Sequence, residues 1–195
     1  MKEIFDLQMQ LNVTTLGNIG LDFEATVRDP DRRPVWIENY RKALSSELAE
    51  IIREVRESGM GTQNGKIEIV DMLHFLVSLS QIVRIDPSEV SLLMKSDNGL
   101  TFHDCAIRTF LALDDLQSSV KWKWWAKGGG YKEEKAEASV RELWKCFDDM
   151  CGVFGLDFET VKRIYVEKNR INFLRQERNY NEDSKTEADN RGIVV

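Results

Sequence analysis

Apolar residues recur at helical spacing along most of this chain, which is the pattern of amphipathic helices packed on a common core. Turn residues, mainly glycine, proline and asparagine, separate the periodic segments. A further short helix is expected from Asp86–Pro87, an N-cap followed by proline, to about Gly99, and residues 17–35 are expected as a loop. No convincing strand pair is indicated, so the expected fold class is all-α, a helical bundle. The periodicity predicts helices over residues 3–16, 36–57, 66–83, 101–125, 132–154 and 158–178.

The helix predicted over residues 66–83 is apolar on almost every side, which is typical of a buried helix. It nevertheless carries Glu68 and Asp71, and buried acids are costly unless they are paired, protonated or metal-bound. The preceding helix carries Glu47 and Glu50 at the same spacing of three, so each pair shares one helix face.

A Gly-rich turn at residues 58–65 allows these two helices to pack as an antiparallel hairpin with the four acids facing one another. Four converging carboxylates suit Mg²⁺, a hard cation that prefers oxygen ligands. We therefore expect a metal-binding core within a four-helix bundle. A solvated helix face remains an alternative for Glu47 and Glu50.

A faint internal repeat suggests that the helix pair is duplicated. Residues 85–90 resemble residues 156–161 at an offset of 71, although chance similarity is an open alternative. If the repeat is real, only the first copy keeps its acids. The offset aligns Glu47 with Ser118, Glu50 with Lys121, Glu68 with Ser139 and Asp71 with Glu142.

Length and composition narrow the class of protein. With 195 residues, of which 42% are hydrophobic, one domain over residues 1–178 is expected, followed by a polar and mobile tail or lid over residues 179–195. The net charge of −6 argues against a general nucleic-acid or anionic-membrane binder, although a local basic patch remains compatible with it. Three cysteines without metal-ligand spacing fit a reducing compartment. With no signal-peptide pattern and no membrane-spanning stretch, a cytoplasmic protein is expected.

Several motifs together resemble one enzyme family. The two acid pairs, Glu47-Leu-Ala-Glu50 and Glu68-Ile-Val-Asp71, resemble the paired motifs of the all-α nucleoside triphosphate pyrophosphatases. Three further segments resemble the dimeric dUTPase branch, which includes the dCTP/dUTP pyrophosphatases of T-even phages. These segments are Gln8-Met-Gln-Leu-Asn12, Lys168-Asn-Arg-Ile-Asn172-Phe-Leu-Arg175-Gln-Glu-Arg-Asn-Tyr180 and Glu187-Ala-Asp-Asn190. Trp36, eleven residues before Glu47, also resembles the phage-type enzymes.

The chain departs from the family pattern in three places. Asn179 stands where the family has a glycine before the tyrosine, and the segment between Tyr180 and Asn190 is short. The Lys-Trp-Lys-Trp-Trp run at 121–125 resembles an element that usually follows the first acid helix, but here it follows the second. Its role in the family is therefore not transferred to this chain.

The resemblance implies Mg²⁺-dependent hydrolysis of dUTP, dCTP or both to the nucleoside monophosphate and pyrophosphate. It implies a homodimer without nucleic-acid or membrane partners, in the host cytoplasm if the gene belongs to a phage. Glu47 would orient or deprotonate the attacking water. The metal ligands would be Glu47, Glu50, Glu68 and Asp71.

The remaining candidates would bind the nucleotide. Lys168, Asn172 and Arg175 share one helix face at i, i+4 and i+7, which suits phosphates but also suits a solvated basic face. The expected base and sugar contacts come from Gln8, Asn12, Trp36, His74 and Phe75, with packing in the core as the alternative for His74 and Trp36. The resemblance implies that Tyr180 closes over the phosphates and that Asn190 also contacts the nucleotide.

Two other functions remain open. The first is a pyrophosphatase for another or a modified deoxynucleoside triphosphate, because the sequence does not show the pocket that selects the base. The second is a catalytically silent helical interaction protein, which would gain no stability from Mg²⁺.

Overall fold

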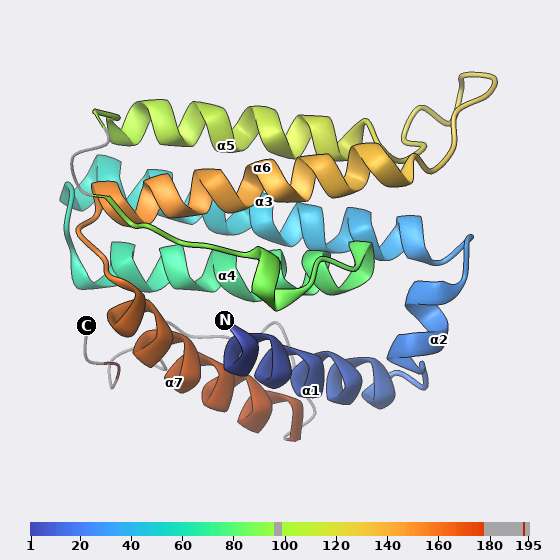
Figure 1. Ribbon diagram of the computed structural model, residues 1–195, viewed down its shortest axis with the longest axis horizontal. Helices are drawn as coiled ribbons and strands as arrows, with labels where there is room; N and C mark the ends of the chain where they lie inside the picture. Colours follow the sequence, from blue (N-terminus) through green and yellow to red (C-terminus); the bar gives the residue numbers. More distant parts are fainter. Residues whose placement is uncertain (96–98, 178–192, 194–195) are drawn as a thin grey trace.

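The computed structural model describes residues 1–95, 99–177 and 193, and every regular element in these ranges is helical. The all-α expectation is therefore confirmed (Figure 1). In chain order the elements are α1 (Lys2–Asn18), α2 (Phe23–Arg28), α3 (Arg33–Ser58), α4 (Gln63–Val83), the 3₁₀ turn η1 (Pro87–Glu89), α5 (Phe102–Gln117), α6 (Glu133–Val153) and α7 (Phe158–Glu177).

Two helical hairpins, α3–α4 and α5–α6, pack side by side as a four-helix bundle in which α4 lies against α6 and α3 lies against α5. Helices α1 and α7 pack against each other and against the outer side of α4 (Figure 1). Helix α4 thus has neighbours on nearly all sides, which explains why it is apolar almost all round.

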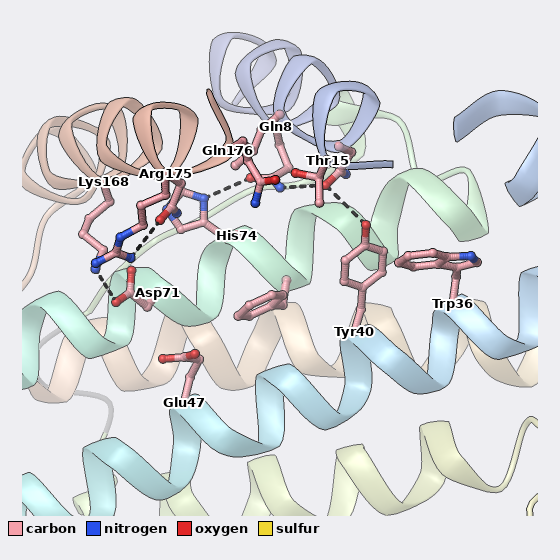
Figure 2. Close-up of a pocket in the computed structure, with 14 residues that line it drawn as sticks. Gln8, Thr15, Trp36, Tyr40, Glu47, Asp71, His74, Lys168, Arg175 and Gln176 are labelled. Carbon is pink, nitrogen blue, oxygen red and sulfur yellow. Dashed lines mark hydrogen bonds and ion pairs between the residues drawn. The ribbon is translucent and has the colours of Figure 1, made fainter. Parts of the chain in front are cut away.

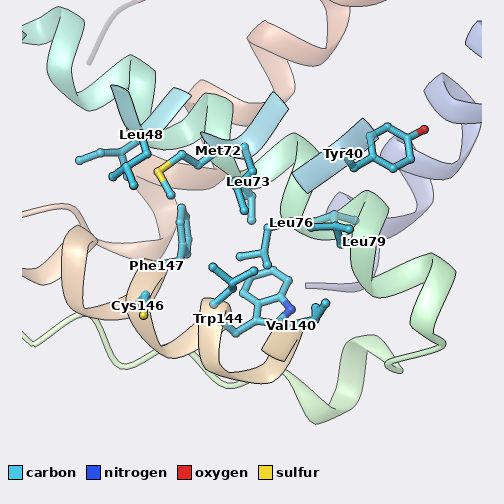
Figure 3. Packing of buried hydrophobic residues seen from close by; sticks show 14 of the residues in the cluster. Tyr40, Leu48, Met72, Leu73, Leu76, Leu79, Val140, Trp144, Cys146 and Phe147 are labelled. Atoms are coloured by element: carbon cyan, nitrogen blue, oxygen red, sulfur yellow. The ribbon is translucent and has the colours of Figure 1, made fainter. Parts of the chain in front are cut away.

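The core fills the space between α4 and the helices around it. Met72, Leu73 and Leu76 of α4 lie beside Trp144 and Phe147 of α6 (Figure 3). The one polar group of this contact is also satisfied, because the Trp144 indole Nε1 donates a hydrogen bond of 2.9 Å to the Ser80 hydroxyl. The two hairpins therefore form one continuous core.

The expectation of a loop over residues 17–35 is wrong in part, because α2 lies inside it and α3 begins at Arg33 rather than at Trp36. The Asp22 carboxylate caps α2 by accepting a hydrogen bond of 2.7 Å from the Ala25 amide. Pro34 is expected in the loop, yet it occupies the first turn of α3, where a missing backbone N–H costs nothing.

The short helix expected to run to about Gly99 is also wrong, because only the 3₁₀ turn forms. Beyond it the chain crosses α6, and the amides of Leu93 and Met94 both donate to the Asp148 carboxylate at 2.7 and 2.8 Å. A side chain of α6 thus binds the donors that a helix would have used. The crossing is close, since a Cβ on Gly152 would lie 2.2 Å from the Lys95 carbonyl oxygen.

Helix α5 ends at Gln117, eight residues before its predicted end at Trp125. The Ser119 hydroxyl donates to the Leu116 carbonyl at 2.6 Å, and the Ser119 carbonyl accepts from the Lys132 amide at 2.8 Å. A local side-chain bond of this kind competes with the helical one and ends the helix. Residues 121–125 consequently lie in a loop rather than on a helix.

In the part of the chain that the structure describes, no helix is both long and apolar enough to cross a bilayer. Most of the predicted tail lies outside the described residues. Ile193 is the exception: it is buried, and its carbonyl accepts a hydrogen bond from the Gln63 side chain at the start of α4.

Candidate active site

Three of the four predicted acids meet across the α3–α4 hairpin. Glu47, Glu50 and Glu68 each offer a carboxylate oxygen, and these oxygens all lie within 4.8 Å of one another. Glu47 and Glu68 are only 8% and 6% exposed. Carboxylates so close together and so far from water repel one another unless a cation or a proton joins them, and a hard divalent cation fits an all-oxygen donor set.

The turn between the two helices sets this register. Glu54, one turn beyond Glu50 on α3, accepts hydrogen bonds from Thr62 at 2.7 Å and from Asn64 at 3.2 Å. Thr62 also caps α4 by accepting from the Gly65 amide. The start of α4 is thereby held against the last turns of α3, so that Glu68 lies level with Glu50.

The fourth acid, Asp71, forms a buried ion pair with a residue far away in the sequence. The Lys168 ammonium of α7 lies 2.7 Å from the Asp71 carboxylate, and both side chains are largely buried. Lys168 was expected at the phosphates from its spacing with Asn172 and Arg175. The structure pairs it with Asp71, where it compensates negative charge, and Lys168 lines the same pocket as Asn172 and Arg175.

Glu47 and Asp71 border a pocket of about 280 Å³ between α1, α3, α4 and α7. Figure 2 shows Trp36 and Tyr40 at one end of the pocket and Glu47, Asp71 and Lys168 at the other. The pocket therefore has an aromatic end and a charged end. Its lining consists of Gln8, Leu11, Asn12, Thr15, Trp36, Tyr40, Glu47, Asp71, His74, Phe75, Lys168, Asn172, Arg175 and Gln176.

Gln8 and Asn12 line the pocket, but their amides already bind other side chains. The Gln8 Nε2 donates to Asn12 and to Ser78 at 3.0 and 3.1 Å, and the Asn12 Nδ2 donates to Ser78 and to Gln81 at 3.0 and 2.9 Å. The carbonyl oxygen of Gln8 accepts from the Tyr165 hydroxyl at 2.7 Å. Because both side-chain amides already make these hydrogen bonds, they are suited to holding the surrounding side chains in place.

His74 is one of the neighbours that they hold. Its Nδ1 lies 3.0 Å from the Gln8 carbonyl oxygen, which can only accept, so the assigned tautomer carries its proton on Nδ1. The other ring nitrogen, Nε2, is then a bare acceptor, and it is buried without a hydrogen-bond partner among the described residues. Burial, followed by the nearby Lys168 charge, lowers the His74 pKa to about 3, so the ring is neutral.

The aromatic end of the pocket is a row of three rings. The Trp36 and Tyr40 ring centroids lie 5.7 Å apart, and those of Tyr40 and Phe75 lie 6.3 Å apart. The Tyr40 hydroxyl faces the amide network and lies 3.4 Å from the Asn12 carbonyl oxygen. The rings are tilted to one another by 45° and 38°, and together they offer an aromatic wall to a base or a sugar.

The charged end continues along α7. The Arg175 guanidinium donates to the Asn172 side chain at 3.3 Å, which orients it beside the pocket. At the end of α7, the Asn18 amide of α1 donates to the Gln176 carbonyl at 3.2 Å. The cationic face of α7 therefore borders the same pocket as the acids of α3 and α4.

The structure thus brings most of the predicted site residues to one place. Glu50 and Glu68 stand beside the pocket as members of the acid cluster, whereas Tyr180 and Asn190 lie outside the described residues. The sequence analysis missed Thr15, Tyr40, Ser78, Tyr165 and Gln176. Helical spacing carried a signal for several of these residues. Thr15 follows Gln8 by seven positions, Ser78 follows His74 by four, and Tyr165 precedes Lys168 by three.

Comparison with known proteins places this chain in a family. A family model described as dUTPase matches residues 1–180, which is nearly the whole chain. No curated protein and no solved structure matches this chain.

Proposed function

This chain belongs to the dUTPase family, and from that premise we propose that it hydrolyses dUTP, dCTP or both to the monophosphate and pyrophosphate with Mg²⁺. The family match supports the broader function, a nucleoside triphosphate pyrophosphohydrolase with a dUTP-type substrate. The observation that carries the proposal is the cluster of Glu47, Glu50 and Glu68 beside a pocket with one aromatic and one cationic end.

The metal would be held by Glu47, Glu50 and Glu68, with Asp71 next to them. A bound divalent cation neutralises triphosphate charge and lowers the pKa of a water molecule. Of the three clustered acids only Glu47 also lines the pocket, which supports the water-orienting or proton-accepting role that the family resemblance implies for it.

The triphosphate would lie at the charged end. Arg175 offers a fork of donors that matches phosphate oxygens, and Lys168 offers a point charge. Because Lys168 is ion-paired with Asp71, a cation bound at the acids frees its ammonium to turn toward a phosphate. The Asp71–Lys168 pair would in this way couple metal binding to substrate binding.

The base would lie at the aromatic end, and His74 would help to select it. Its buried Nε2 can accept a hydrogen bond but cannot donate one. Uracil offers a donor at N3, whereas cytosine has an acceptor there and donates only from its amino group. Because this acceptor fits either donor, we rank dUTP above dCTP on the family match, whose description is dUTPase. Gln8 would act by fixing His74, and Asn12 by fixing Gln8, rather than by reading the base.

The second copy of the homodimer would pack on the outer face of α5. Ile107, Phe110 and Leu111 form a helical stripe there, with exposed fractions of 47%, 62% and 55%. His103 and Asp114 are exposed at its two ends, so an antiparallel copy places each histidine opposite the partner's aspartate. A stripe with an apolar centre, an imidazole at one end and a carboxylate at the other is complementary to itself.

The activity test is pyrophosphate release from dUTP, dCTP, dTTP, dATP and dGTP with Mg²⁺, beside Glu68→Ala. We expect dUTP to be the best substrate and the variant to be inactive. Faster turnover of dCTP would overturn the ranking of dUTP above dCTP. If no nucleotide is hydrolysed and Mg²⁺ raises the Tm of neither protein, the pyrophosphatase proposal is wrong, because a ligand that binds the native state must stabilise it.

The dimer test is light scattering of the full chain beside Phe110→Glu. The charge should give a monomer, whereas Leu93→Glu, at an exposed apolar residue outside α5, should leave the dimer intact. A monomeric parent, or a dimer that survives Phe110→Glu, would contradict the proposed interface.

A further inference from the structure

The connection between α5 and α6 differs in charge and composition from the rest of the chain. Residues 118–132 contain Lys121, Lys123, Lys127 and Lys132 and no acidic residue, in a chain with a net charge of −6. The same segment contains three of the five tryptophans. In Figure 1 it projects from the end of the bundle as a long loop. We call residues 118–132 the Trp–Lys loop.

The tryptophans of the Trp–Lys loop are turned toward solvent. Trp124 is 77% exposed and Trp125 is 78% exposed, the two highest values among the exposed large hydrophobic residues. Trp122 meets Trp125 edge to face with the ring centroids 5.9 Å apart, and the Lys123 ammonium lies 4.9 Å from the centre of the Trp122 ring. Indoles left in water at such exposure commonly mark a binding surface.

A groove of about 690 Å³ lies between the Trp–Lys loop and the start of α3. Trp122, Trp124 and Tyr131 give it aromatic walls, and Asn39 and Gln117 give it amide groups. It shares no residue with the pocket of the candidate active site. A ligand in this groove would therefore be separate from the substrate.

The charged groups of the groove are mainly cationic. Arg41, Lys42 and Lys121 line it together with the acids Asp31 and Glu38. Glu38 accepts two hydrogen bonds of 2.8 Å from the Arg41 guanidinium and lies 3.8 Å from the Lys42 ammonium. These pairs compensate Glu38 and also part of the charge of Arg41 and Lys42, so the excess positive charge comes mainly from the lysines of the loop.

We propose that the Trp–Lys loop and this groove bind single-stranded nucleic acid. Exposed aromatic rings stack on bases of any sequence, and interleaved lysines follow the phosphates, which is the usual design of such sites. Three indoles and four lysines along one loop span more than one nucleotide, so a strand fits better than a free nucleotide. A membrane surface would leave the amides inside the groove without a partner. A second copy of the chain would bind at the stripe on α5 under the dimer proposal above.

The test is fluorescence anisotropy of a labelled 20-nucleotide oligo-dT titrated with the full chain at low salt. Stacking is worth about 1–3 kcal/mol per base, so Trp124→Ala/Trp125→Ala should weaken binding at least tenfold. Ile19→Ala/Leu93→Ala, which removes two other exposed apolar side chains, should leave binding unchanged. Pyrophosphate release should be the same in all three proteins, because none of these residues lines the active-site pocket.

Salt dependence gives a second readout. The logarithm of the binding constant should fall linearly with the logarithm of the salt concentration, with a slope of about −0.7 for each phosphate neutralised. Lys123→Gln/Lys127→Gln should therefore reduce that slope by about 1.4.

Three results would overturn the proposal. The first is no binding to the oligonucleotide, or equal binding by the parent and the double-tryptophan variant. The second is flotation with phosphatidylglycerol vesicles, lost in that variant, while the oligonucleotide stays free, which would assign the loop to a membrane. The third is a dimer that becomes a monomer when Trp124 and Trp125 are replaced, which would assign the loop to a second copy.

Discussion

The α3–α4 hairpin buries Glu47 and Glu68, whereas the acids of the α5–α6 hairpin are half-buried or exposed. At the offset suggested by the sequence repeat, buried Glu68 corresponds to Ser139, whose hydroxyl donates to the Lys135 carbonyl of its own helix at 2.8 Å. Asp71, which pairs with a buried lysine, corresponds to Glu142, whose partners Arg108 and Lys145 are both substantially exposed.

In this protein, whether a hairpin can hold buried charge depends on which helices pack over it. Helices α1 and α7 lie on α4 and supply the Lys168 cation and the amide network around His74. The interface of α5 and α6 with solvent has no such cover, and its ion pairs are screened by water. Under the proposed function the α3–α4 hairpin keeps these costly groups because they bind metal and substrate, and four experiments test this difference between the hairpins.

The largest effect should be on activity. Glu47→Gln keeps the shape of the side chain but removes its charge from the cluster, so we expect kcat to fall by about 10³-fold, or roughly 4 kcal/mol of transition-state stabilisation. Glu142→Gln in the other hairpin should leave kcat unchanged. Steady-state pyrophosphate release from dUTP measures both variants. An equal loss of kcat in both variants would show that catalysis does not depend on the α3–α4 hairpin in particular.

The next effect concerns stability in the absence of metal. Lys168→Met leaves Asp71 buried beside the other acids, and breaking a buried ion pair by removing one partner costs about 3 kcal/mol. Arg108→Met removes a cation from Glu142 and Asp149 near the surface, where a pair is worth about 1 kcal/mol or less. Urea unfolding in EDTA measures both. A cost for Arg108→Met that matches the cost for Lys168→Met would contradict the contrast in burial.

A third effect is a loss of stability as the pH falls. Variants of the two histidines of the chain show which of them causes it. The His74 pKa is lowered from 6.5 to about 3, so below pH 6.5 the unfolded chain binds a proton that the folded protein refuses. Stability is therefore lost as the pH falls, by about 2 kcal/mol between pH 8 and pH 5. Urea unfolding at both pH values should show this loss in the parent and in His103→Gln, but not in His74→Gln.

The smallest effects distinguish two serines on opposite faces of α4, Ser78 and Ser80. Ser80→Ala removes the acceptor of the Trp144 indole, and Ser78→Ala removes the hydroxyl that joins Gln8 to Asn12. Each lost hydrogen bond should cost about 1 kcal/mol of stability. Only Ser78→Ala should also raise KM for dUTP, because only its partners line the pocket. If Ser80→Ala raised KM as well, the pocket would depend on the junction between the hairpins.

Much of the architecture was readable from residue patterns. The helices followed from apolar periodicity, and the buried position of α4 followed from its apolar residues on every side. Helix α2 was missed because it is short and its signal is one capping residue, Asp22. The false short helix after Pro87 had good local signals, but Asp148, some fifty residues away, binds the amides that such a helix needs.

By itself the sequence determined which residue types stand on which helix face, because that depends only on the 3.6-residue turn and on local capping. The acid pairs, the cationic face of α7 and the aromatic candidates are all of this kind. Only the tertiary structure decided which faces meet. It set Lys168 against Asp71, turned the Gln8 amide toward His74 and the Asn12 amide toward Ser78 and Gln81 instead of leaving them open to a base, and left the Trp–Lys loop in solvent. These contacts join helices that are distant in sequence, and their energies depend on burial and distance, which no local spacing encodes.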